Sequence, residues 1–210
     1  MHVVAALTDP ADAALGEEQG ADMAELRLDL TGGDFVRQVE QCRKNCSLPI
    51  IATLRSVDEG GRFSGSADEW AAAIAPVIPL VDYVDVEQRF ARHAVLVRAA
   101  GKKIIASHHA GRMVPLSALF AMERELRAFG DIPKIIVTPA TQDDVVELIA
   151  FTSAATKPVC TGVMGSEFRY ARAILPLFGS ELVYCSVGTP TAEGQYAVAE
   201  FKALQKMLAP

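Results

Sequence analysis

The chain has 210 residues, of which 50% are apolar and 22% charged, and its formal net charge is −6. This composition is typical of a globular protein rather than a disordered or fibrous one, and the length suits one compact domain spanning residues 1–210. The negative charge disfavours binding to nucleic acid or to an anionic membrane. No run approaches the roughly 18 apolar residues of a membrane span, and the beginning of the chain resembles a first strand more than a signal peptide. We therefore expect a cytoplasmic protein.

The cysteines indicate neither disulfides nor zinc. Cys42, Cys46, Cys160 and Cys185 are too few and too irregularly spaced for a disulfide framework. No His or Cys pair has the spacing of a zinc site. We expect free thiols and no bound metal.

Short β-rich runs alternate with segments of helical character along the whole chain. The runs cover residues 2–7, 22–29, 49–54, 81–87, 102–107, 132–138, 158–163 and 181–185. Ser66 with Glu69 has the spacing of a capping box, and Thr141 followed by Asp144 opens another helix. Eight such units predict parallel strands closed into a single-domain (β/α)8 TIM barrel, with an open doubly wound sheet as the alternative.

Two further helices are marked by their ends. Pro115 suits a first helical turn, and Gly130 supplies the stop of that helix. A final helix is expected from about Gly194 to Leu208.

The second and third predicted strands carry charges on the wrong face for an apolar core. In the run 22–29 the leucines share one side, which leaves Glu25, Arg27 and Asp29 pointing into the barrel. Thr53 and Arg55 alternate with apolar residues in the same way. One interpretation is an ionic cluster that pairs with itself and only fills the interior. The other is a polar pocket at the carboxyl ends of the strands, where barrel enzymes place their active sites.

Polar residues continue along the next two strands. Asp85 and Glu87 share one parity, and they are equally compatible with a solvated strand end and with a functional site. Ser107 and His109 share a side in the fifth strand, and His108 lies on the other. Only one histidine should therefore face inward, although parity alone does not say which.

Lys134 lies in an apolar run, Lys-Ile-Ile-Val-Thr, where a lysine is unusual. It either marks an exposed strand entrance or points inward. In the second case burial and nearby cations would disfavour the ammonium form, which makes a lysine nucleophilic toward a carbonyl. A lysine beside an inward histidine suggests catalysis through an imine.

The last two strands are followed by loops that suit an anion. The segment Gly162–Gly165 leads to a helix with Arg169 and Arg172, and residues 187–195 follow the eighth strand. In many barrels these loops bind phosphate. Alternatively, the arginines bind a carboxylate.

Taken together, these residues resemble the type I 3-dehydroquinate dehydratases, the imine-forming dehydratases of the shikimate pathway of aromatic amino acid biosynthesis. The resemblance rests on an ordered set of fragments: Glu25-Leu26-Arg27-Leu28-Asp29, Arg55 with Glu59-Gly60-Gly61, Asp85-Val86-Glu87, Ser107-His108-His109, Asp131-Ile132-Pro133-Lys134-Ile135, Met164-Gly165, Arg172, Phe178-Gly179-Ser180 and Gly194-Gln195.

The resemblance implies a role for each site residue. Lys134 would form the imine with 3-dehydroquinate, His109 rather than His108 would be the catalytic histidine, and Glu59 would orient and polarise it. Arg172 would bind the substrate carboxylate. The pocket would be lined by Glu25, Arg27 and Arg55, and the closing loop would contribute Thr191 and Gln195. The family's chemistry needs no metal or other cofactor, and its members are often homodimers.

Three features depart from the family pattern. Ala110-Gly111 replaces the usual acidic and aromatic residues after the histidine, Ala171 replaces a serine before the arginine, and Thr191 replaces a serine of the closing loop. Two other functions stay open. A Schiff-base aldolase would bind the phosphate of a sugar between the last two loops, and a catalytically silent barrel would bind a metabolite without turnover.

Overall fold

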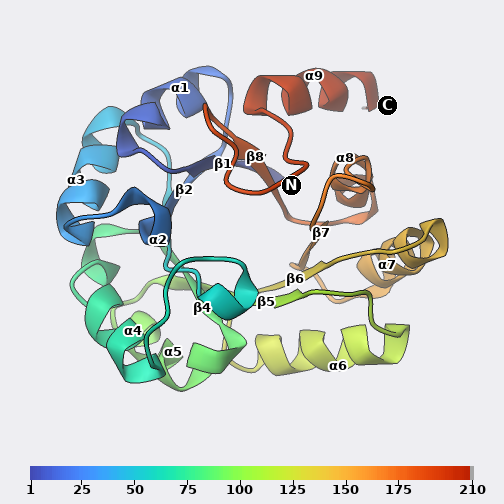
Figure 1. The fold of residues 1–210 in the computed structure, drawn as a ribbon, viewed down its shortest axis with the longest axis horizontal. Helices are drawn as coiled ribbons and strands as arrows, with labels where there is room; N and C mark the ends of the chain where they lie inside the picture. The colour runs from blue at the N-terminus through green and yellow to red at the C-terminus, as the bar shows by residue number, and fades with distance from the viewer. Residues whose placement is uncertain (209–210) are drawn as a thin grey trace.

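The computed structural model describes residues 1–208, which form eight parallel strands alternating with helices. The helices surround the strands (Figure 1). The strands are β1 (His2–Leu7), β2 (Met23–Arg27), β3 (Ile50–Thr53), β4 (Tyr83–Glu87), β5 (Lys103–Ala110), β6 (Ile132–Val137), β7 (Cys160–Val163) and β8 (Leu182–Ser186). The α-helices are α1 (Ala13–Glu18), α2 (Leu28–Thr31), α3 (Phe35–Asn45), α4 (Ala67–Ile74), α5 (Ala94–Ala99), α6 (Leu116–Arg127), α7 (Gln142–Ala154), α8 (Ala171–Ile174) and α9 (Val198–Leu208).

The strands close into a barrel rather than an open sheet. Neighbours in sequence pair in parallel from β1 to β7, and β1 also pairs with β8, from His2↔Leu182 to Ala6↔Ser186. The last seam, between β7 and β8, is held by a bridge between Val159 and Ser180. The predicted single-domain (β/α)8 barrel is therefore confirmed, and the doubly wound alternative is wrong.

Most element boundaries lie within two residues of their predicted positions. The capping boxes Ser66/Glu69 and Thr141/Asp144 are both formed at the starts of α4 and α7. The fifth strand is longer than predicted, because it continues to Ala110 and so includes both histidines. Pro115 is the N-cap of α6 and not part of its first turn.

The final helix begins at Val198, so the prediction that it starts near Gly194 is wrong. The connection after β8 first crosses the top of the barrel, and Gly194 has a positive φ of 74° that ends any helical path there. The residues of this connection that precede Val198 are not helical, and they reach the site described below.

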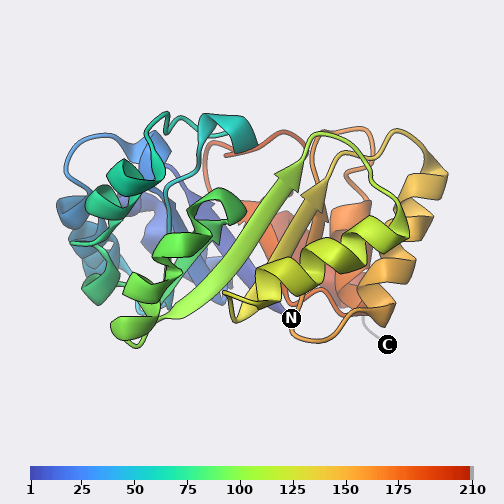
Figure 2. The ribbon, with the colours of Figure 1, turned by 90° about the horizontal axis from the view of Figure 1, so that it is seen from below.

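The barrel interior is divided into two layers. The amino-terminal half is filled by an apolar cluster made of Val4, Met23, Ile51, Ile105, Cys160 and Leu182. Charged and polar side chains occupy the layer above, toward the carboxyl ends of the strands. Figure 2 shows the barrel from the side, with the arrowhead of the yellow-green strand β5 at the edge where the loops gather. The apolar layer closes the floor and leaves the polar layer facing one mouth.

Among residues 1–208, no helix combines the length and the apolar character that a bilayer crossing requires.

Candidate active site

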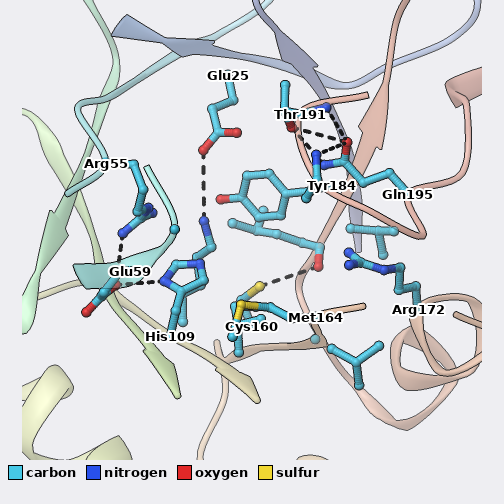
Figure 3. A pocket seen from close by; sticks show the side chains of 18 of the residues that line it. Glu25, Arg55, Glu59, His109, Cys160, Met164, Arg172, Tyr184, Thr191 and Gln195 are labelled. Atoms are coloured by element: carbon cyan, nitrogen blue, oxygen red, sulfur yellow. Dashed lines mark hydrogen bonds and ion pairs between the residues drawn. The ribbon is translucent and has the colours of Figure 1, made fainter. Parts of the chain in front are cut away.

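An open cavity lies at the carboxyl ends of the strands. Residues of β2, β5, β6, β7 and β8 meet there with Arg55, which follows β3, and with the loops that follow β7 and β8 (Figure 3). The lining includes all nine predicted site residues: Glu25, Arg27, Arg55, Glu59, His109, Lys134, Arg172, Thr191 and Gln195. Side chains that are far apart in sequence therefore share one space.

Lys134 is the third residue of β6 and points into the barrel. Only 4% of its surface is exposed, so the alternative that Lys134 marks an exposed entrance to the strand is wrong. The Nζ atom lies 3.0 Å from Asp85 Oδ2 and 3.9 Å from Glu25 Oε1, above the ring of Tyr184. The groups in direct contact with the amine are thus carboxylates, rather than the cations expected from the sequence. These contacts fix the amine at the cavity wall.

Arg55 connects the charges of the barrel interior. Its Nη2 atom contacts Asp85 at 2.9 Å, and its Nη1 atom contacts Glu59 and Glu87, each at 3.1 Å. Asp85 and Glu87 are each 2% exposed, so the interpretation that they are solvated is wrong. Ser107 donates a hydrogen bond of 2.5 Å to Asp85. The charges pair with one another, as the interpretation of a self-paired ionic cluster predicted, and two of them, Arg55 and Glu59, also line the cavity.

This network sets the ionisation of its members. Burial by itself would lower the pKa of Arg55, but the surrounding carboxylates, Asp85 foremost, raise it above its ordinary value. Burial opposes ionisation of Asp85, but Arg55 and Lys134 lower its pKa to about 2. Asp85 is therefore a fixed negative charge at 3.0 Å from the lysine amine.

His109 and Glu59 form a partly buried pair on the cavity wall. His109 Nδ1 lies 2.7 Å from Glu59 Oε2, which leaves Nε2 as the ring atom available to a bound molecule. Burial and then the charges of Arg55 and Lys134 lower the pKa of His109 well below its usual range. Burial raises the pKa of Glu59 to about 8, against the opposing effect of Arg55. The imidazole is therefore neutral at physiological pH.

His108 has a different position. Its side chain is 29% exposed, and its Nδ1 atom is 3.7 Å from Glu59 Oε1. It does not belong to the cavity lining, whereas His109 does. The structure thus shows that His109, and not His108, faces the cavity, which strand parity alone did not decide.

The second strand supplies two more side chains to the cavity. Glu25 accepts a hydrogen bond of 2.8 Å from Thr53. Arg27 is held by Asp29, through Nε to Oδ1 at 2.9 Å and Nη2 to Oδ2 at 2.8 Å. The strand ends at Arg27, so the prediction that Asp29 belongs to it and faces inward is wrong. Asp29 instead fixes the direction of the arginine from the first turn of α2.

The opposite side of the cavity is built by the two loops expected to bind an anion. Arg172 donates to the backbone oxygen of Glu193 at 3.2 Å, and its Nε has no protein partner among the described residues. Burial lowers the pKa of Arg172, so the guanidinium gains from an anionic partner. Gly194 packs so closely on Gly165 that a side chain there would collide with the backbone. The two loops therefore form one wall.

Thr191 and Gln195 belong to the loop that crosses the cavity mouth. The Gln195 side-chain oxygen accepts hydrogen bonds from the backbone amide of Thr191 at 2.9 Å and from that of Ala192 at 3.2 Å. The Gln195 amide nitrogen donates to Thr191 Oγ1 at 2.9 Å. These bonds, drawn between Thr191 and Gln195 in Figure 3, hold the loop in one shape.

Comparison with known proteins identifies the family of this chain. A family model described as type I 3-dehydroquinase matches residues 4–209. The chain belongs to the type I 3-dehydroquinase family. A 3-dehydroquinate dehydratase from Methanoregula boonei is 66% identical over 208 residues, which cover 99% of this chain and 100% of that protein.

Two more distant relatives carry the same name. A 3-dehydroquinate dehydratase from Methanospirillum hungatei JF-1 is 38% identical over 100% of this chain and 82% of its own length. The crystal structure of the 3-dehydroquinate dehydratase from Aquifex aeolicus VF5 gives a TM-score of 0.86 at 27% identity, covering 100% of this chain and 99% of the other. The resemblance inferred from the motifs is confirmed.

The departures from the pattern of type I 3-dehydroquinases leave the charged centre intact. Ala171 is fully buried in the core between helix and barrel, directly before Arg172. A side chain at Gly111 would meet open space, so glycine there leaves the region beyond His109 unfilled. Neither position belongs to the cavity lining.

Part of the cavity wall was not predicted from the sequence. Tyr184, Cys160, Met164 and Ile136 line the cavity beside the charged residues and give it an apolar side. The alternation along β8, which places Tyr184 on the inward face with Leu182, was the signal that could have found the tyrosine. Residues 1–208 contain no group of three or more His, Cys, Asp or Glu side chains arranged to hold a metal ion.

Proposed function

We propose that this chain is a hydro-lyase that converts 3-dehydroquinate to 3-dehydroshikimate and water through an imine on Lys134. The observation that carries the proposal is a buried lysine amine and a neutral histidine in one cavity, within a member of the type I 3-dehydroquinase family. Purified protein mixed with 3-dehydroquinate should produce the ultraviolet absorbance of the conjugated product. Binding of 3-dehydroquinate without any product would favour the catalytically silent barrel instead.

The first step joins the amine of Lys134 to the C3 ketone. The neutral amine adds to the carbonyl carbon, and one proton passes from the nitrogen to the carbonyl oxygen. A second proton, taken from solvent, lets that oxygen leave as water and gives a cationic iminium. The Asp85 carboxylate, which lies 3.0 Å from the lysine nitrogen, stays ionised because its pKa is about 2. It therefore stabilises the positive charge that the iminium keeps at that nitrogen.

The second step is the elimination, which we infer to be syn because one histidine serves both of its proton transfers. His109 Nε2 takes a proton from C2, and the electron pair of that bond moves into the iminium to give an enamine. The enamine then expels the C1 hydroxyl, which leaves as water after receiving the proton from His109. Glu59 at 2.7 Å stabilises the imidazolium formed between the two transfers. Water finally hydrolyses the imine and releases Lys134.

The Glu59–His109 pair predicts how activity depends on pH. His109 accepts a proton at Nε2 when its ring proton is on Nδ1 and is donated to an ionised Glu59. Because the pKa of Glu59 is raised to about 8, this form increases as the pH rises toward 8. We expect kcat/KM to rise from about pH 6 to pH 8, because kcat/KM follows the ionisation of an essential base in the free enzyme.

Glu59→Gln is the matched test of this pH dependence. The glutamine oxygen accepts from Nδ1 at every pH, so the rise should disappear, and kcat should fall about tenfold because the imidazolium loses its charged partner. The measurement is kcat/KM across pH 6 to 9 for both proteins. The same rise in Glu59→Gln would assign it to another group and contradict the role given to Glu59.

Arg172 is proposed to bind the substrate carboxylate. Arg172→Gln removes a charged hydrogen-bond donor from the far wall of the cavity, and we expect kcat/KM to fall about 10- to 100-fold, mainly through KM. Arg169→Gln is the control, because Arg169 pairs with Glu200 at 3.1 Å and does not line the cavity. Equal losses in the two variants would show that the effect is structural.

The rival aldolase differs in its ligand. It requires inorganic phosphate or a sugar phosphate to compete for the cavity, whereas the dehydratase requires a carboxylate at Arg172. The match to the type I 3-dehydroquinase family supports the dehydratase rather than the aldolase. Saturable inhibition by phosphate, with no turnover of 3-dehydroquinate, would support the aldolase.

The proposal also covers the oligomeric state, the location and the cofactor requirement of the enzyme. On the strength of the family resemblance we propose a homodimer that works in the cytoplasm, within the shikimate pathway, on a small-molecule substrate and without a metal or other cofactor. Light scattering tests the oligomeric state, since a homodimer has twice the chain mass of 22.5 kDa.

A further inference from the structure

Tyr184 combines two features that the mechanism above does not use. Its ring lies beneath the amine of Lys134, with Nζ 3.9 Å from the ring centroid. Its hydroxyl oxygen is buried and has no hydrogen-bond partner among residues 1–208. A buried hydroxyl without a partner costs free energy, so its position beside the amine of Lys134 points to a bound ligand as the missing partner.

The hydroxyl faces the substrate cavity. Tyr184 belongs to the lining, and in Figure 3 its hydroxyl points to the side where Glu25 and His109 lie. Burial, followed by the negative charge of Glu25, raises the pKa of Tyr184 well above its ordinary value. The group is therefore a neutral phenol at physiological pH and is able to donate a hydrogen bond.

The proposed function fixes which part of the substrate lies there. The C3 atom is bonded to Lys134, and C1 with its carboxylate extends toward Arg172. In a six-membered ring C2 and C4 flank C3, so C4 lies on the side away from Arg172. Figure 3 shows Glu25 and Arg172 on opposite sides of the site. The C4 hydroxyl is therefore directed toward Glu25 and Tyr184.

A hydroxyl suits this pair of neighbours because it is both a donor and an acceptor. The Glu25 carboxylate accepts hydrogen bonds, one of them from Thr53 at 2.8 Å, and Tyr184 is a free donor among the described residues. We propose that Tyr184 donates a hydrogen bond to the C4 hydroxyl of 3-dehydroquinate while Glu25 accepts one from it, so that Tyr184 selects substrates hydroxylated next to the imine carbon. This inference rests on the proposed function.

Tyr184→Phe isolates the hydroxyl, because phenylalanine keeps the ring beneath Lys134. We expect kcat/KM for 3-dehydroquinate to fall roughly 3- to 10-fold through KM, as for the loss of one hydrogen bond. A borohydride-reduced adduct should still form on Lys134. The melting temperature should be unchanged or higher, since the variant removes an unsatisfied buried group. Tyr83→Phe, which alters a phenol at the floor of the barrel, should leave kcat/KM unchanged.

The analogue of 3-dehydroquinate that lacks the C4 hydroxyl distinguishes binding from a structural effect. The parent and Tyr184→Phe should process this analogue with equal kcat/KM, because the proposed contact is missing from both. The proposal is overturned if Tyr184→Phe keeps full kcat/KM on 3-dehydroquinate, or if it loses the same factor on both compounds. Failure of the parent itself to act on 3-dehydroquinate would overturn the proposed function, and this inference with it.

Discussion

Replacement of Lys134 by methionine is expected to abolish both turnover of 3-dehydroquinate and formation of a reducible imine. Methionine has a similar length and can keep the contact with the ring of Tyr184, but it has no nucleophilic nitrogen. The loss should be on the order of 10⁴-fold or more, as for other covalent nucleophiles. Steady-state kinetics and borohydride trapping on the same preparation measure both effects.

The structure explains why this variant should still fold. Asp85 loses its contact with Lys134 but keeps the ion pair with Arg55 at 2.9 Å, and Glu25 keeps the hydrogen bond from Thr53 at 2.8 Å, so both buried carboxylates retain a partner. Lys103→Met is the matched control, since Lys103 is exposed at the opposite end of the barrel and should keep full activity. A folded Lys134→Met protein with substantial activity would contradict the covalent mechanism.

Replacement of His109 by alanine should separate imine formation from elimination. Lys134 remains free to attack the ketone, so the adduct should still be trapped, while kcat falls by about 10²- to 10⁴-fold through loss of the acid–base group. His108→Ala is the control, because His108 is 29% exposed and lies outside the cavity lining. If His108→Ala lost activity and His109→Ala kept it, the roles of the two histidines would be exchanged.

Strand alternation was the strongest signal in the sequence, because a two-residue period places side chains on one of two faces. It correctly placed Glu25 and Arg27 inside the barrel, and Thr53 and Arg55 beside them. It failed for Asp29, because the chain turns into a short helix after Arg27. A parity rule holds only as long as the strand continues.

Other features depend on contacts between distant segments and were not available from local patterns. The sequence left Asp85 equally compatible with solvent and with a site, and only its pairing with Arg55 and Lys134 in the folded barrel decides between them. The loop over the cavity was assigned in part to the final helix, because helical propensity does not show that Gln195 bonds back to Thr191. Tyr184 was overlooked because its importance lies in what surrounds it.

The most direct test of the imine mechanism is borohydride reduction in the presence of 3-dehydroquinate, followed by peptide mass mapping. We expect one reduced adduct, on the peptide that contains Lys134, and none when borohydride is added without the substrate. Folded protein that turns over 3-dehydroquinate without any adduct, or with an adduct on another lysine, would contradict the assignment of Lys134 as the nucleophile.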